Sequence, residues 1–125
     1  MDEDTIPVES DSPLQARLAA LLAQAEAAYL REAGGEAVCT LHKDGRVSGG
    51  LKYEEGRVVA LRDFQRALQR TEITEKDMPD GAQKLLAAEL ARWQADLAHQ
   101  LAQNRPLPWV AYAQGGVDAL RALGE

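Results

Sequence analysis

The sequence of 125 residues has a single cysteine, Cys39, and no apolar run of the length that crosses a bilayer. One thiol cannot form a disulfide within the chain, and it cannot supply the two or more thiolates of a cysteine-rich zinc site. A bilayer span needs roughly 18 consecutive apolar residues. Residues 1–4 (MDED) are acidic, whereas a signal peptide begins with basic residues. These absences predict a protein without a membrane segment, and we expect it in the cytoplasm.

Basic residues are in the minority, with 14 Lys and Arg against 20 Asp and Glu and a formal net charge of -6. The acidity is concentrated at the N-terminus. Residues 1–11 contain five acidic residues and no basic one, whereas residues 39–70 contain seven basic and four acidic residues. Segment 1–11 also holds Pro7 and few apolar residues, a composition typical of disorder. We predict an acidic disordered tail over 1–11 and a single, nearly neutral domain over 12–125 that is long enough to bury its own core.

The N-terminal part of this domain has the pattern of one amphipathic helix. Ser12 and Pro13 suit the cap and the first position of a helix, and Gly34 and Gly35 suit its end. Between them, apolar residues recur at spacings of three and four, as one buried helical face requires. This pattern predicts a helix over 13–33 with the inward residues Leu14, Leu18, Leu21, Leu22, Ala25, Ala28 and Tyr29.

Residues 36–61 are predicted to form a sheet. Two similar segments, 43–45 (KDG) and 54–56 (EEG), are each followed by Arg-Val, which favours hairpin turns that a glycine closes. A three-residue loop collects the apolar residues on one face, whereas the alternative two-residue turn exchanges the two faces. The interpretation is an α+β fold with a three-stranded antiparallel meander over 36–42, 46–53 and 57–61.

The rest of the chain is predicted to be helical. Asp80 suits the cap of a long helix, and Asn104 suits its end. Gly115 and Gly116 leave a broken C-terminal helix open, and an edge strand over 109–112 is a further alternative. The predicted elements are a short helix over 64–71, a long helix over 80–104 with a buried stripe from Leu86 to Leu101, and a short helical segment over 108–123.

Residues that often carry catalysis or bind metals do not converge in this fold. Cys39 and His42 lie three apart on a predicted strand, so they point to opposite faces. His99 follows Asp96 by three residues on the polar face of the long helix, which suits a surface ion pair. We predict no catalytic, cofactor-binding or metal-binding residue, and a protein that is not an enzyme.

The basic middle segment has the most unusual pattern in the chain. Arg62, Arg66 and Arg70 are spaced by four, so a helix places them along one face. There, like charges destabilise each other by a few tenths of a kcal/mol unless an anion compensates. Arg46 and Lys52 extend the positive area along the predicted sheet. An ordinary solvated face is one interpretation, and a docking surface is the other. A further hypothesis is that the acidic tail folds over the arginines and competes with a ligand.

These features favour a protein-protein interaction or regulatory module that binds another protein or its own copy as a homodimer. The predicted contact surface consists of the five basic residues and the outer face of the sheet. Trp109 and Tyr112 are either interface anchors or core residues. The alternative function is nucleic-acid binding through the basic region 39–70, with the acidic tail as competitor.

Overall fold

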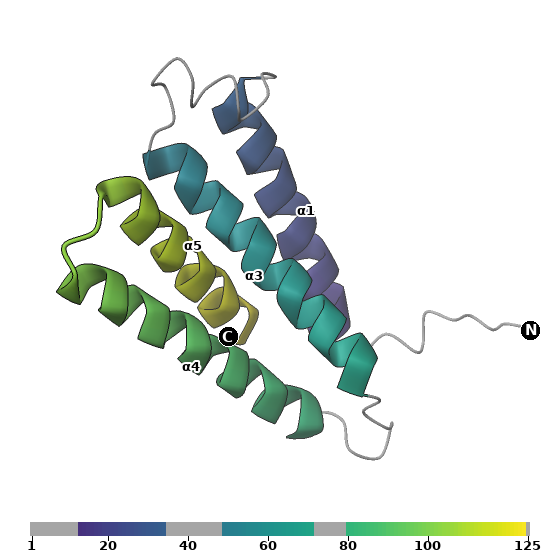
Figure 1. Ribbon diagram of the computed structural model, residues 1–125. Coiled ribbons are helices and arrows are strands. Elements are labelled where there is room, and N and C mark those ends of the chain that lie inside the picture. The colour runs from purple at the N-terminus through teal and green to yellow at the C-terminus, as the bar shows by residue number, and fades with distance from the viewer. Residues whose placement is uncertain (1–12, 35–48, 72–79, 125) are drawn as a thin grey trace, which may run out of the picture.

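The computed structural model describes residues 13–34, 49–71 and 80–124. Helices hold 94% of these residues, and no strand occurs among them. The predicted α+β fold is therefore wrong: the described chain is all-helical. Its helices lie side by side in the order α1, α3, α5, α4 (Figure 1). Their bounds are Pro13–Ala33 for α1, Gly49–Thr71 for α3, Asp80–Ala102 for α4 and Leu107–Gly124 for α5.

α1 has the bounds that the sequence predicts. Leu14, Leu18 and Ala25 are buried along one face, as the spacing requires. Gly34 follows the last helical residue with a φ of 63°, in the left-handed region that glycine tolerates. Its backbone N–H donates to the carbonyl oxygen of Leu30 at 3.1 Å and closes the helix.

α3 replaces the described part of the predicted meander. The predicted strand over 57–61, residues 49–53 of the strand over 46–53, and the short helix over 64–71 form one continuous helix. The strand over 36–42 lies outside the described residues. Buried Leu51, Val58 and Leu61 share the inner face of this helix with Phe64.

The surface of α3 is also suited to a helix. Ion pairs between residues three apart join Lys52 to Glu55 at 2.9 Å and Arg57 to Glu54 at 2.6 Å, and a third pair joins Arg66 to Asp63. Pairs at this spacing stabilise a helix by roughly 0.2–0.5 kcal/mol each. Four further residues of α3 are Arg or Gln, whose long unbranched side chains lose little rotamer freedom in a helix.

Gly56, interpreted above as a turn residue, is instead a helix contact. Glycine destabilises a helix interior by about 1 kcal/mol relative to alanine, but here the missing Cβ makes room for α5. A Cβ on Gly56 would lie 2.0 Å from the carbonyl oxygen of Tyr112, and one on Gly115 would lie 2.1 Å from that of Tyr53. The backbones of α3 and α5 therefore touch, and this helix pair is the most extensive in the structure.

α4 ends at Ala102, two residues before the predicted limit, in a motif closed by Asn104. The φ of Asn104 is 53°, and the N–H of Arg105 donates to the carbonyl oxygen of Gln100 at 3.1 Å. This is the bonding pattern of a left-handed helix cap, a conformation that asparagine tolerates better than most residues.

α5 is continuous through Gly115 and Gly116, so the broken-helix and edge-strand alternatives are both wrong. A Cβ on Gly116 would lie 2.2 Å from the ring of Trp93, so the indole packs directly on the backbone of α5. The two glycines thus bring α5 close to α3 on one side and to α4 on the other.

The core lies around α3 and α5, with α1 covering one side and α4 the other (Figure 1). Leu101 of α4 was predicted to face inward, but it is 56% exposed. No described helix has both the length and the apolar character that crossing a membrane requires. The largest fully buried side chains are Leu51, Leu61, Phe64, Val117, Leu120 and Leu123.

Candidate protein interaction surface

A groove of about 470 Å³ lies between the C-terminal half of α1 and the N-terminal half of α3. Tyr29 and Leu30 line its α1 side, and Val58 and Val59 line its α3 side. Leu30 is 64% exposed, so this side chain leaves apolar surface in water that burial against a partner would remove. We call this feature the apolar groove. Its lining is completed by Glu26, Glu55 and Arg62.

The charged residues at the edges of the apolar groove are paired with each other. Arg62 of α3 donates to Glu26 of α1 at 2.5 Å, and its side chain is 53% exposed. An exposed pair of this kind contributes about 0–1 kcal/mol. Burial, and then the Glu55 carboxylate, raise the pKa of the Tyr29 phenol, so Tyr29 is neutral at physiological pH. The groove combines apolar walls with charges that can change partners at little cost.

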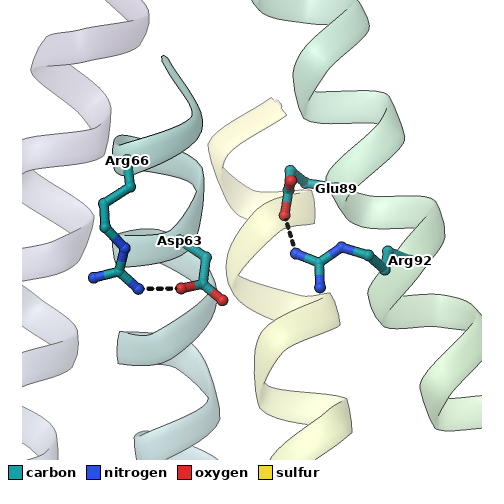
Figure 2. Close-up of polar contacts among 4 residues, drawn as sticks. All are labelled: Asp63, Arg66, Glu89 and Arg92. Atoms are coloured by element: carbon teal, nitrogen blue, oxygen red, sulfur yellow. Dashed lines mark hydrogen bonds and ion pairs between the residues drawn. The ribbon is translucent and has the colours of Figure 1, made fainter. Parts of the chain in front are cut away.

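Arg62, Arg66 and Arg70, here called the arginine stripe, all lie on α3 with exposed side chains. Arg66 is tied to Asp63 of its own helix, as Figure 2 shows. Arg70 forms no ion pair with any described residue. Within the described part of the chain, acidic side chains therefore compensate Arg62 and Arg66 but not Arg70.

A second groove, of about 330 Å³, continues between the N-terminal half of α1 and the C-terminal half of α3. We call it the polar groove because glutamines surround its small apolar floor. It lies next to Arg66 and Arg70 in the sequence of α3. Its lining residues are Gln15, Ala16, Leu18, Ala19, Gln65, Leu68 and Gln69.

Of the other two predicted contact residues, only Lys52 can be placed, and it lies away from this surface. Arg46 lies outside the described residues. Lys52 is 7% exposed and lies at the opposite end of α3 from Arg70, with its Nζ 4.8 Å from the centroid of the Trp109 ring. A cation over an indole face is an attractive interaction, so Lys52 joins α3 to α5. Among the described residues the predicted outer sheet face is absent, because Val58 and Ala60 of that face are buried in α3.

On its other side, α3 borders a hollow of about 330 Å³ that α4 and α5 also line. Figure 2 shows this region, with Asp63 on α3 and Arg92 on α4. Arg92 pairs with Glu89 of its own helix. Val59 lines both this hollow and the apolar groove, so the outer face of α3 is one continuous surface.

Aromatic side chains form a row beside this surface. The Trp93 and Tyr112 ring centroids are 5.5 Å apart, and those of Trp109 and Tyr112 are 6.5 Å apart with an edge-on geometry. Burial raises the pKa of Tyr112, as do the carboxylates of Glu55, Asp63 and Asp96 to a lesser degree. Of the two predicted anchors, Tyr112 packs against the core, whereas Trp109 is 46% exposed.

Of the histidine and cysteine candidates, only His99 lies among the described residues, and its side chain has no partner there. His99 lies exposed on α4, and Cys39 and His42 lie outside the described residues. The described chain contains no group of three His, Cys, Asp or Glu side chains that could hold a metal ion.

Leu30 and Glu26 contribute to the apolar groove, but neither was predicted from the sequence to do so. Leu30 does carry a signal, because it is a large apolar residue that falls outside the buried spacing of the helix over 13–33. The sequence contains no signal for the pairing of Glu26 with Arg62, because this pair depends on how α1 and α3 pack.

No family model, curated protein or solved structure matches this chain. The proposals that follow therefore rest on the contacts of the described residues.

Proposed function

We propose that this protein is a protein-protein interaction module that binds an acidic, amphipathic segment of another protein along the outer face of α3. The observation that carries the proposal is the apolar groove, with Leu30 exposed at its edge and the arginine stripe directly after it on α3. A helix with one apolar face and acidic neighbours has the complementary pattern.

The apolar part of the interface supplies affinity. Tyr29, Leu30 and Val59 retain accessible surface in the free protein, and its removal from water contributes about 25 cal/mol per Å². The apolar walls of the groove can receive apolar side chains of a partner segment, while its charged edges limit which segments fit.

The arginine stripe makes binding selective for partner segments that carry Asp or Glu. Arg70 has no ion-pair partner among the described residues, and the pairs of Arg62 and Arg66 are exposed. Arginine forms two-pronged hydrogen bonds with carboxylates, so these residues can exchange an exposed internal pair for a partner's Asp or Glu. The same two internal pairs reduce the positive field available to a nucleic-acid backbone.

The proposal is tested by site-specific photo-crosslinking in native extract. A photoreactive residue at Leu30 should crosslink to an acidic segment of one recurring protein, while the same residue at Ala98, exposed on α4, should not. The purified partner segment should then bind the Arg66→Ala/Arg70→Ala variant about tenfold more weakly, which corresponds to roughly 1.4 kcal/mol.

The matched control is Arg105→Ala/Arg121→Ala, which removes the same charge at exposed positions in the α4–α5 turn and on α5. It should bind the segment as the wild type does. Equal crosslinking at Leu30 and Ala98 contradicts the proposal. Binding of duplex RNA or DNA that falls steeply with salt and is lost in Arg66→Ala/Arg70→Ala also contradicts it, in favour of a nucleic-acid partner.

A further inference from the structure

The arginine stripe has a candidate occupant within its own chain. Residues 1–12 carry Asp2, Glu3, Asp4, Glu9 and Asp11 and no basic residue. This segment therefore bears a charge of -5 out of the -6 of the whole chain. Its chemistry is that of the acidic partner proposed above.

The place where this segment joins the fold is next to the stripe. α1 begins at Pro13, and Gln15 and Ala16 of its first turn line the polar groove opposite Gln65 and Gln69 of α3. Because α1 and α3 run antiparallel (Figure 1), the start of α1, to which the acidic segment is joined, lies at the end of α3 that carries Arg66 and Arg70.

The acidic segment is long enough to reach along the arginine stripe. Eleven residues span at most roughly 36–40 Å when extended, whereas α3 rises only about 12 Å between Arg62 and Arg70. A short tether of this kind holds its end at an effective concentration in the millimolar range, so a contact with a dissociation constant in that range is formed in about half of the molecules.

The acidic segment also carries apolar side chains that suit the groove. Ile6 and Val8 flank Pro7, and proline disfavours helix at the residue before it. In an extended segment, residues two apart point to the same side. Ile6 and Val8 can then contact the floor of the polar groove, which Leu18 and Leu68 line.

We propose that residues 2–11 dock along the polar groove of the same chain, with their carboxylates beside Arg66 and Arg70, and compete with the acidic partner for the arginine stripe. The competition rests on the proposed function, but the docking does not, since it occurs in the free protein. The tail is then an internal inhibitor whose removal strengthens partner binding.

Paramagnetic relaxation enhancement in the full chain tests the docking without any partner. A nitroxide is attached at Thr5→Cys in a Cys39→Ser background, which leaves every charge of the tail in place. Amides of Gln65, Gln69 and Arg70 should broaden severalfold more than in a matched chain whose five acids are changed to Asn and Gln. The excess should disappear at high salt, because exposed charge contacts are screened.

The matched surface variants are Arg66→Glu/Arg70→Glu, which should abolish the excess broadening, and Arg105→Glu/Arg121→Glu, which changes the net charge equally and should preserve it. If the labelled chain does not fold, Nε–Hε shifts of Arg66 and Arg70 are compared between the unlabelled wild type and the chain with neutral tail residues. Equal broadening, or equal shifts, with acidic and neutral tails would overturn the docking. Docking with no gain in partner affinity for the neutral tail would overturn the competition alone.

Discussion

Tyr53 connects the two central helices through one hydroxyl group. Its O–H donates to Asp118 Oδ2 at 2.6 Å, while Gln114 Nε2 donates to Asp118 Oδ1 at 2.8 Å. Burial, followed by the hydrogen bond to Asp118 and the charge of this carboxylate, raises the pKa of Tyr53 to about 12. The ordinary value for tyrosine is about 10. Nothing in the sequence pairs Tyr53 with a residue so distant in the chain.

Tyr53→Phe should destabilise the protein by about 1.5–3 kcal/mol at neutral pH, because it removes a hydrogen bond to a charged group. The raised pKa sets the pH dependence: the folded state keeps a proton that the unfolded state loses between about pH 10 and pH 12. The stabilisation by Tyr53 is therefore complete below pH 10 and is lost as the pH rises through 12. Urea unfolding of both proteins from pH 8 to pH 12 measures this. A stability difference that stays constant across that range contradicts the assignment.

At the scale of the helices, close contact between α3 and α5 depends on two Tyr-x-x-Gly segments, 53–56 and 112–115. In each, the glycine touches the backbone of the other helix at its tyrosine. The packing compensates the poor helix propensity of glycine, and it also positions the outer face of α3 between α1 and α4.

Gly56→Ala should destabilise the protein by about 3 kcal/mol or more, because the added methyl group meets backbone that cannot rotate away. Gly124→Ala is the matched control. There the new Cβ would lie 3.4 Å from a leucine methyl group, an ordinary contact, and stability should stay within about 0.5 kcal/mol. Denaturant unfolding of the three proteins compares them. A Gly56→Ala variant as stable as Gly124→Ala would show that the helices do not touch there.

For the whole molecule, apolar side chains remain exposed around the α4–α5 turn. Leu101 is 56% exposed, Leu107 is 70% exposed and Trp109 is 46% exposed. Exposed leucine and tryptophan near one another are typical of protein interfaces. The homodimer expected from the sequence stays a prediction, and this end of the bundle is where we expect its contact.

Sedimentation velocity over a range of concentrations tests the homodimer. The sedimentation coefficient of the wild type should rise with concentration, and Leu101→Glu/Leu107→Glu should remove the rise by placing charge in the contact. Leu30→Glu, which alters the apolar groove instead, should leave it intact. A wild type that sediments as one monomeric species at every concentration contradicts the prediction.

The acidic residues are unevenly distributed along the whole chain. The net charge of -6 arises mainly from the strongly acidic residues 1–11, whereas residues 12–125 are nearly neutral in total. Under the proposed function, we therefore expect partner choice to follow the local arrangement on α3, where exposed arginines lie beside a groove, rather than the overall charge.

The sequence by itself determined α1 and the start of α4 to within one residue, because caps and apolar spacing act within a few residues of chain. The predicted limits of the C-terminal helical segment also lie within one residue of those of α5, but the sequence left its continuity open. It also determined that Arg62, Arg66 and Arg70 share one helical face. It did not determine whether 49–61 is helix or strand. Leu51, Tyr53 and Leu61 satisfy an alternating pattern, and Leu51, Val58 and Leu61 satisfy a helical one.

Only the tertiary structure decided between these two patterns. Gly56 is unfavourable in an isolated helix and favourable in a hairpin turn, but its contact with Tyr112 of α5 makes the helix the better packed state. The same packing separates Lys52 from the arginine stripe and brings Glu26 to Arg62. Each of these outcomes depends on contacts between residues that are far apart in the chain. The spacing of residues along a short segment carries no information about the free energy of such contacts.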